Sequence, residues 1–473
     1  MNTESLLPPR RLSGFKAYDI RARVPDELDG DAAYRIGRAF ADFLGAGSLV
    51  VGRDVRLSGP DLAAALIRGI TDAGADVWDL GLCGTEMVYF ATRHLAAGGG
   101  IMVTASHNPA DFNGFKLVGA QAKPVSGDSG LAAVRGMAED GRFRRAAVAG
   151  AQRRVDITSA YVAHLLEYLY PANLRPLRVV VNPGNGAAGP ILDRVADYLP
   201  MRLERLHHEP DGRFPHGVPN PLLPENREAT AAAVRRHGAD FGVAWDGDFD
   251  RCFLFDENGD FIEGYYLIGL LAEEFLRESP GEPVVHDPRL YWGTVERVQA
   301  MGGMPVQSKT GHAFMKECMW QEEAVYGAEM SGHHFFRRFG YCDSGMIPWL
   351  LMARILGRSD QPLSALVAER QAAYPCSGEI NFTVADPHKV MEQVVAGYRR
   401  QQPVIDRTDG VSLEFPHWRF NLRPSNTEPL LRLNLETRGD RALMNEKTEE
   451  VSAMVRGIAD KVSDAPPIGS AIP

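Results

Sequence analysis

The sequence predicts an α/β protein of several domains that ends in a domain of a different, α+β type. Three observations support this prediction. With 473 residues, the chain is long enough for three or four domains of ordinary size. Short apolar runs alternate with amphipathic segments through most of the chain, which is typical of parallel sheets with crossover helices. In roughly the last 100 residues the strand-like segments have fewer crossovers, which favours an antiparallel sheet.

The α/β pattern occurs three times as a strand, a helix and a second strand. The three sets span residues 48–52, 61–73 and 76–80, then 177–182, 187–198 and 202–206, then 283–287, 293–301 and 304–309. A further strand is expected at 100–104. In the last domain we expect strands at 377–384, 411–415, 418–422 and 430–436, with helices near 388–400 and 441–461. The joints between domains are expected near 153–156, 256–260 and Tyr374.

Composition excludes several classes of protein. Lys and Arg number 51 against 61 Asp and Glu, a formal charge of -10 without a basic block, so nucleic acid is not the expected partner. The five cysteines are scattered and form no C-x-x-C pair, which indicates reduced thiols. No signal-peptide pattern is visible, and the most apolar stretches, 265–276 and 346–356, are too short to cross a bilayer. We therefore expect a soluble cytoplasmic protein that does not bind membranes.

The first segment that could carry chemistry is T-A-S-H-N-P at 104–109, directly after the apolar run 99–103. A serine just past the carboxyl end of a parallel strand lies where α/β sheets place their reacting groups. His107 could orient the hydroxyl of Ser106, and Lys116 could supply charge or move a proton. A polar turn with a helix-capping serine is the alternative, so the segment needs support elsewhere.

A second segment, D-G-D-F-D-R at 246–251, lies between apolar strands at 241–245 and 252–255. Carboxylates at alternate positions can converge on one hard cation, for which we expect Mg²⁺. Arginine beside such a site favours a phosphoryl ligand. An EF-hand loop is disfavoured because Arg251 replaces its glycine, and an acidic surface turn is the simpler alternative. The candidate metal ligands are Asp246, Asp248 and Asp250.

Two further segments could recognise a phosphorylated sugar. In E-M-S-G-H at 329–333, Glu329 and Ser331 could bond to neighbouring hydroxyls, and His333 is a candidate proton carrier. In R-P-S-N-T-E at 423–428, an arginine followed by hydroxyl and amide donors suits a phosphate dianion, with an ordinary hairpin as the alternative. The arginine-bearing segments 16–21 and 52–58 are expected to make further phosphate or structural contacts.

A dinucleotide site is a competing hypothesis. G-N-G-A-A-G at 184–189 matches G-x-G-x-x-G between a strand and a helix. The next strand, however, ends in His207-His208-Glu209 without a convincing acidic partner for a ribose. We also find no Walker A loop, which disfavours a nucleotide-dependent kinase.

In this order, the four motifs resemble the α-D-phosphohexomutase superfamily across essentially the whole chain. The methionine of E-M-S-G-H resembles the phosphomannomutase/phosphoglucomutase branch, whereas phosphoglucosamine mutases resemble E-Q-S-G-H. The resemblance implies three similar α/β mixed-sheet domains plus a C-terminal α+β domain around a central active-site cleft. The domains would carry the phosphoserine, metal-binding, sugar-binding and phosphate-binding loops in turn, with boundaries at 1–157, 158–258, 259–372 and 373–473.

The resemblance also implies the reaction. Mannose 6-phosphate and mannose 1-phosphate, and the corresponding glucose phosphates, would interconvert through a phosphoserine enzyme and a hexose 1,6-bisphosphate, which would also serve as activator. Ser106 would carry the phosphoryl group and hold Mg²⁺ together with the three aspartates. The catalytic set would include Arg251, against that phosphate, with His107, Lys116 and His333. The substrate-binding residues would be Tyr18, Arg21, Arg289, His312, Glu329, Ser331, Arg423, Ser425, Asn426 and Thr427.

Three positions depart from the family pattern. Ala22 and Ala328 stand where relatives often have glycine, so the backbone at Ala328 should avoid positive φ. Arg289 stands roughly where many relatives have lysine, and it could not serve as a base near neutral pH. Alternatives to the mannose/glucose mutase are a phosphoglucosamine or other sugar-specific phosphomutase and a non-catalytic phosphosugar-binding protein. The sequence does not decide between mannose and glucose preference or between monomer and dimer.

Overall fold

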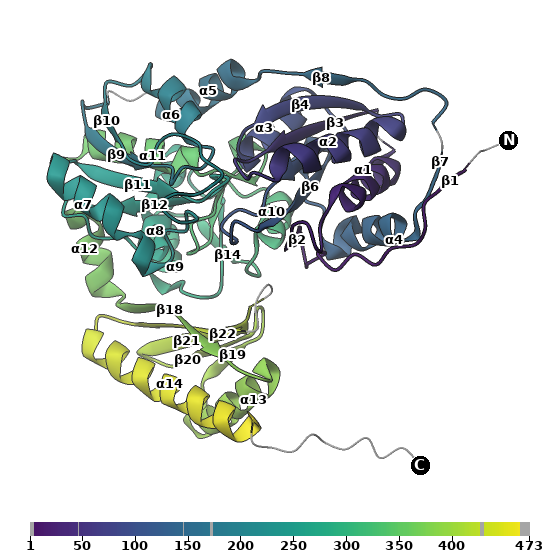
Figure 1. The fold of residues 1–473 in the computed structure, drawn as a ribbon. Helices are drawn as coiled ribbons and strands as arrows, with labels where there is room; N and C mark the ends of the chain where they lie inside the picture. The colour runs from purple at the N-terminus through teal and green to yellow at the C-terminus, as the bar shows by residue number, and fades with distance from the viewer. Residues whose placement is uncertain (1–3, 46, 145, 171–173, 426–429, 464–473) are drawn as a thin grey trace, which may run out of the picture.

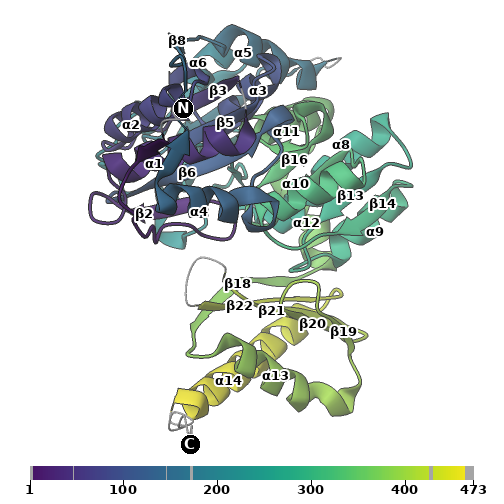
Figure 2. The same cartoon turned by 90° about the vertical axis from the view of Figure 1, so that its right-hand side faces the viewer.

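The computed structural model describes residues 4–45, 47–144, 146–170, 174–425 and 430–463. Four units, each built on one principal sheet, follow one another along the chain, and we call them domains I to IV (Figure 1). Domains I to III lie side by side, whereas domain IV lies below them and joins domain III near Tyr374 (Figure 2). Within these described ranges, no helix is long and apolar enough to cross a membrane.

Domain I is a six-stranded mixed sheet with helices on both faces. Its strands lie in the order β2 (Ile20–Arg23), β6 (Phe112–Gly119), β5 (Gly99–Val103), β3 (Ser48–Arg53), β4 (Asp76–Leu82) and β8 (Gln152–Arg154). Its helices are α1 (Gly30–Leu44), α2 (Gly59–Asp72), α3 (Thr85–His94) and α4 (Ala132–Asp140), and β1 (Glu4–Leu6) pairs with β7 (Arg142–Arg144). Successive side chains of β3 point to opposite faces of the sheet. Leu49 and Val51 therefore belong to one apolar core, and Val50 belongs to the other.

Domains II and III repeat the mixed-sheet plan. Domain II has strands β10 (Arg202–Arg205), β9 (Arg178–Asn182), β11 (Phe241–Trp245) and β12 (Cys252–Phe255), with helices α5 (Thr158–Leu166), α6 (Gly189–Ala196) and α7 (Glu228–His237). Domain III has strands β14 (Met304–Gln307), β13 (Pro283–His286), β15 (Tyr326–Ala328), β16 (His334–Phe336) and β17 (Cys342–Asp343). Its helices are α8 (Gly264–Glu278), α9 (Trp292–Ala300), α10 (His312–Gln321), α11 (Met346–Arg358) and α12 (Leu363–Ala373).

Domain IV is the expected antiparallel α+β unit. Its sheet runs β18 (Cys376–Thr383), β22 (Leu430–Thr437), β21 (Trp418–Pro424), β20 (Val411–Glu414) and β19 (Val404–Asp406), with helices α13 (Pro387–Tyr398) and α14 (Arg441–Ser463). Its buried apolar side chains form a core of their own. The predicted fold class, three mixed α/β domains followed by an α+β domain, is therefore confirmed.

The structure shows the backbone at Ala22 and Ala328, the two alanines that stand where relatives often have glycine. Ala22 lies in β2 and Ala328 lies in β15, so both alanines have the extended conformation that a residue with a Cβ atom tolerates. Positive φ angles occur at several non-glycine residues of the described chain, and two of these are Ser106 at 50° and Phe249 at 46°. Each of the two expected reacting segments therefore contains one residue with a strained backbone.

Candidate active site

Ser106, the expected nucleophile, lies on a tight loop that follows β5. Its backbone is held by the guanidinium of Arg56, which donates to the carbonyl oxygens of Ser106 at 2.8 Å and Asn108 at 2.6 Å. The same guanidinium donates to the carbonyls of Pro109 and Phe112, both at 2.7 Å. Four bonds from one buried cation oppose the cost of a left-handed serine. Of the phosphate or structural contacts expected for the segment 52–58, Arg56 thus makes structural ones.

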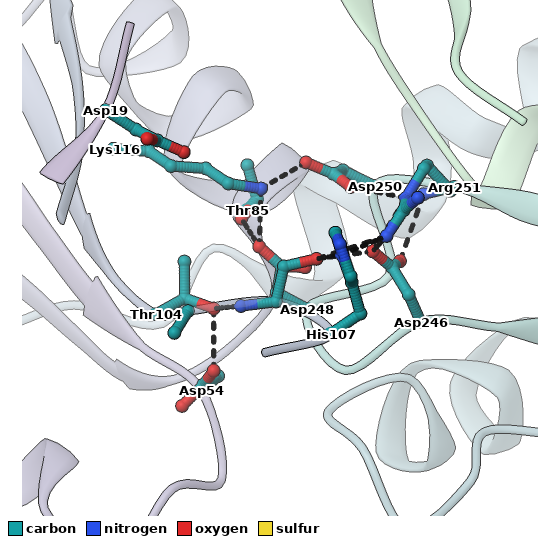
Figure 3. A network of polar contacts seen from close by, with 12 residues as sticks. Asp19, Asp54, Thr85, Thr104, His107, Lys116, Asp246, Asp248, Asp250 and Arg251 are labelled. Atoms are coloured by element: carbon teal, nitrogen blue, oxygen red, sulfur yellow. Dashed lines mark hydrogen bonds and ion pairs between the residues drawn. The ribbon is translucent and has the colours of Figure 1, made fainter. Parts of the chain in front are cut away.

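The hydroxyl of Ser106 points at the metal-loop segment of domain II. Its Oγ donates to Asp246 Oδ2 at 2.6 Å and lies 3.1 Å from His107 Nδ1. Arg251 donates to the same aspartate oxygen from Nε at 2.9 Å and from Nη2 at 2.8 Å. Burial and the nearby Arg251 hold the pKa of His107 well below its ordinary value, so its imidazole is neutral. Figure 3 shows the two segments meeting through these side chains.

The three aspartates of the D-G-D-F-D-R loop converge. Each offers a carboxylate oxygen within 4.8 Å of the others, and all three are buried. Lys116 Nζ donates to Asp248 Oδ2 at 2.7 Å and also contacts Asp250. Thr85, at the start of α3, donates to Asp248 through its hydroxyl at 2.5 Å and through its amide at 3.0 Å. Domain I therefore holds the loop of domain II by both charge and hydrogen bonds (Figure 3).

The protonation of this cluster follows from burial and charge. Burial and the neighbouring Asp248 raise the pKa of Asp250 to about 6. Burial opposes ionisation of Asp248 too, but the ammonium of Lys116 holds its pKa below the ordinary value. Within the described part of the chain, the Oδ1 atoms of Asp248 and Asp250 are buried and accept no hydrogen bond. Hard carboxylate oxygens without partners fit a divalent cation such as Mg²⁺.

The sugar-loop residues lie in domain III, between β15 and β16. Glu329 accepts a hydrogen bond from the amide of Gly311 at 2.7 Å, and Ser331 Oγ accepts one from Arg289 Nη2 at 3.2 Å. Arg289 is held in turn by Asp287 at 2.6 Å. Burial opposes the charge of Arg289, but Asp287 raises its pKa, so this arginine stays protonated as expected.

His333 connects the sugar loop to the acidic cluster. A ring nitrogen of His333 and carboxylate oxygens of Asp250 and Asp343 lie within 4.8 Å of one another. Its Nδ1 atom is 2.8 Å from Asp343, which also pairs with the buried Lys316 at 2.6 Å. Burial lowers the pKa of His333, but the carboxylates of Asp250 and Asp343 reverse this and raise it. The imidazole is therefore oriented and made more basic, as a proton carrier requires.

Three further expected substrate-binding residues, Tyr18, Arg21 and His312, lie where domain I meets domain III. Arg21 donates to Asp19 at 2.7 Å and to the side chain of Asn108 at 2.6 Å, so it supports the serine loop. Tyr18 meets His312 edge-on with ring centroids 4.7 Å apart, and this pair joins domain I to domain III. Both ring nitrogens of His312 are buried and, among the described residues, neither has a hydrogen-bond partner. Such donors or acceptors suit a ligand.

The segment of domain IV that is expected to bind phosphate, residues 423–428, lies partly within the described residues. Arg423, at the end of β21, is buried and approaches Glu379 at 3.4 Å. Ser425 is held by its amide, which donates to the carbonyl of Leu430 at 2.8 Å. Asn426 and Thr427 lie outside the described residues. Arg289 also reaches Glu379, at 3.6 Å, so the segment lies beside the sugar loop.

The four domains, each with one of the four loops described above, match the domain models of a single protein family in the same order along the chain. Models of the phosphoglucomutase/phosphomannomutase alpha/beta/alpha domains I, II and III match residues 13–144, 159–259 and 263–374, and the C-terminal domain model matches 379–453. The chain belongs to the phosphoglucomutase/phosphomannomutase family. The prediction of the family from the four motifs is therefore confirmed.

Individual members of this family cover nearly the whole chain. Phosphohexose mutases of Xanthomonas campestris pv. campestris are 58% identical over 447 residues, covering 94% of this chain and 100% of the relative. A phosphomannomutase of Escherichia coli is 56% identical over 454 residues, with 94% and 100% covered. A crystal structure of a phosphoglucomutase/phosphomannomutase family protein from Burkholderia thailandensis has a TM-score of 0.84 at 32% identity, covering 94% of this chain and 98% of that chain.

Several residues that shape this family site were missed from the sequence. Thr85 contacts Asp248, Asp343 contacts His333 and Glu379 contacts Arg423, yet none of the three lies in a recognisable motif. Only Thr85 had a local signal, because it begins a helix directly after a strand and a glycine. Asp343 lies ten residues after His333 and Glu379 lies 44 residues before Arg423, and neither spacing belongs to a recognisable pattern.

The G-x-G-x-x-G segment at 184–189 packs against the D-G-D-F-D-R loop. The amide of Ala187 donates to the carbonyl of Gly247 at 3.1 Å, within the metal loop. A Cβ atom on Gly186 would lie 2.8 Å from that same carbonyl, so glycine is required by close approach. The motif therefore supports the backbone of the D-G-D-F-D-R loop.

Proposed function

We propose that the protein is a phosphohexomutase that interconverts mannose 6-phosphate and mannose 1-phosphate, and also the corresponding glucose phosphates. The observation that carries this proposal is the 2.6 Å bond between Ser106 Oγ and Asp246 in a buried cluster with Lys116 and Arg251. The names of the relatives agree, because they are phosphohexose mutases and phosphomannomutases. The expected enzyme class, an intramolecular phosphotransferase, is thereby confirmed.

We assign the phosphoryl carrier to Ser106. In the phosphorylated enzyme, the phosphorus–oxygen bond to Ser106 breaks as a hydroxyl of the bound monophosphate forms a bond to the same phosphorus. His333 would accept the hydroxyl proton on Nε2, because Nδ1 faces Asp343. Arg251 and Lys116 would stabilise negative charge on the moving group. Asp246, Asp248 and Asp250 would hold Mg²⁺, which when bound would neutralise phosphoryl charge.

The second half of the cycle requires the sugar to be reversed. The bisphosphate formed in the first transfer would turn so that its other phosphate faces Ser106, which then regains a phosphoryl group. A free hexose 1,6-bisphosphate would act as activator by phosphorylating an enzyme that had lost this group. Glu329 and Ser331 would bind sugar hydroxyls in both poses, and Arg423 would hold the phosphate that is not reacting. Ser425, Asn426 and Thr427 are proposed to assist Arg423.

The reducing interior of the cytoplasm is the proposed location. Each of the five cysteines is a free thiol, and Cys83, Cys252 and Cys342 are buried. The proposed partner is a small phosphosugar, in keeping with the relatives' names, whereas the negative net charge of the chain disfavours nucleic acid.

A coupled mutase assay tests the proposed function. We expect conversion of mannose 1-phosphate and glucose 1-phosphate in the presence of Mg²⁺ and catalytic glucose 1,6-bisphosphate, and loss of turnover on adding EDTA. Ser106→Ala should abolish turnover. Ser129→Ala, a serine of the same domain in a turn with hydrogen bonds of its own, is the matched control and should retain it. Normal activity of Ser106→Ala would overturn the proposal.

Competition between sugars tests the specificity. Mannose, glucose and glucosamine phosphates at equal concentration should show the first two consumed in preference. A strong preference for the amino sugar would instead assign the protein to the phosphoglucosamine mutases.

A further inference from the structure

Three arginines from different segments converge on one carboxylate of domain IV. Glu379 on β18 lies 3.6 Å from Arg289, 3.4 Å from Arg423 and 3.2 Å from Arg432. Arg289 belongs to domain III, whereas Arg423 and Arg432 are cross-strand partners on β21 and β22. One carboxylate therefore contacts three guanidinium groups, of which Arg289 lies across the domain junction and is also paired with Asp287 at 2.6 Å.

The contacts of this cluster are looser than those of a settled ion pair. Distances of 3.2 to 3.6 Å exceed the 2.7–2.9 Å that is usual for hydrogen bonds between guanidinium and carboxylate. Arg289 and Arg423 are almost fully buried, whereas the side chain of Glu379 keeps 25% of its surface exposed. In the described part of the chain, the Nε atoms of Arg289 and Arg423 have no hydrogen-bond partner. Buried cationic donors without acceptors indicate a place for a further anion.

The position of Glu379 coincides with the point where domain IV meets the sugar loop. Arg289, which contacts Glu379, also contacts Ser331 at 3.2 Å and lies 3.7 Å from Glu329. An anion held by Arg289 and Arg423 would therefore adjoin the sugar hydroxyl contacts. This anion would have to share the two guanidinium groups with Glu379 or displace it.

We propose that Glu379 is an internal anion that stands in for the non-reacting phosphate of the substrate and weakens the grip on it. This inference rests on the proposed function. A mutase must release this phosphate midway through each cycle, because the bisphosphate has to turn before the second transfer. A carboxylate that competes for the same arginines opposes excessively tight binding and stabilises the arginine cluster while the sugar turns. Glu379 thus acts as a positioning residue, not as a catalytic one.

The test measures anion binding without turnover. Inorganic phosphate and glucose 6-phosphate are titrated into Ser106→Ala protein by calorimetry, with and without Glu379→Gln. The neutral amide keeps the shape of the side chain but removes its charge, so both ligands should bind about five- to tenfold more tightly. Glu379→Asp, which retains a carboxylate, should bind phosphate more weakly than Glu379→Gln.

A matched control separates competition from a weakened domain junction. Glu414 accepts hydrogen bonds from Tyr291 at 2.5 Å and Trp292 at 3.1 Å across the same junction. Glu414→Gln should therefore leave the affinity for inorganic phosphate within about twofold of the parent. Unchanged or weaker phosphate binding by a folded Glu379→Gln protein would overturn the proposal. Because no turnover is measured, this outcome is distinct from a failure of the mutase assay.

Discussion

Domains I to III and domain IV are joined to their neighbours by different forces. Buried apolar side chains from domains I, II and III form one continuous core, which includes Val50, Val181 and Phe336. Domain IV has a separate core. Its junction with domain III instead contains polar bonds, such as those from Tyr265 to Glu436 at 2.5 Å and from Gln307 to Asp406 at 2.6 Å.

The difference matches the division of labour in the proposed reaction. Ser106, the aspartate loop and His333 require accurate mutual positions, and they belong to the units that share a core. Arg423, which we propose binds the remote phosphate, belongs to the unit with polar attachments, which can rearrange at lower cost. We therefore expect substitutions in domains I to III to affect turnover and stability, and substitutions in domain IV to affect mainly substrate binding and domain docking.

The largest effect is expected on turnover, from a substitution in the aspartate loop of domain II. Asp248→Asn removes one carboxylate of the convergent trio and one acceptor of Lys116. We expect turnover to fall roughly 10³-fold, because charge on the transferring group loses stabilisation. The coupled assay gives kcat, and binding of glucose 6-phosphate should change little. Asp197→Asn, at an exposed aspartate of the same domain, is the control; a similar loss there would contradict the assignment.

The next effect tests the shared core through Glu86. This buried side chain on α3 accepts bonds from Tyr161 and from Ser344, Gly345 and Met346 of domain III. Glu86→Ala leaves these donors without partners, so we expect the free energy of unfolding to fall by about 3 kcal/mol. Chemical denaturation measures it. A change below about 0.5 kcal/mol would show that the bonds are dispensable.

Glu86 also predicts a pH dependence. Burial raises its pKa to about 8, from about 4.3 in an unfolded chain. The folded protein then keeps a proton that the unfolded chain has lost, so this group lowers stability as pH rises from about 5 to 8. Glu86→Gln cannot titrate and should flatten that part of the profile of melting temperature against pH. An unchanged profile would mean that Glu86 ionises normally.

On the domain IV side, Arg423→Ala should affect binding more than chemistry. Loss of a buried guanidinium that faces the remote phosphate should raise KM about 100-fold, with a smaller change in kcat. Steady-state kinetics with glucose 1-phosphate separate the two parameters. Arg400→Ala, at an exposed arginine of the same domain, should leave both unchanged. A pure loss of kcat in Arg423→Ala would place this residue in the chemical step.

The smallest effect tests the polar junction. Tyr265→Phe removes a hydroxyl that donates to Glu436 and accepts from the amide of Gly293 at 2.7 Å. We expect domain IV to lose about 1 kcal/mol of docking stability, seen as faster amide exchange along β18. Tyr398→Phe, which loses a bond to Glu450 between α13 and α14 inside domain IV, is the control and should leave exchange along β18 at the rate of the parent. Equal exchange in Tyr265→Phe and the parent would contradict the polar attachment.

The sequence could single out the candidate reacting groups because each of the four expected loops is a short contiguous motif. Ser106 and the aspartate trio could be found in this way, and the structure places Ser106 Oγ 2.6 Å from Asp246 Oδ2. Glu86 and Glu379 could not be found, because their partners lie far away in sequence and depend on how whole domains pack. The contact between the G-x-G-x-x-G segment and the D-G-D-F-D-R loop could not be predicted either, because Ala187 and Gly247 meet only in the folded chain.

The transfer of a phosphoryl group through Ser106 is tested most directly by intact-mass spectrometry with peptide mapping. After incubation with glucose 1,6-bisphosphate and Mg²⁺, the protein should gain ~80 Da on Ser106, and excess glucose 6-phosphate should remove this mass. A catalytically active protein that never carries phosphate on Ser106, or that carries it on another residue, would contradict the proposed mechanism.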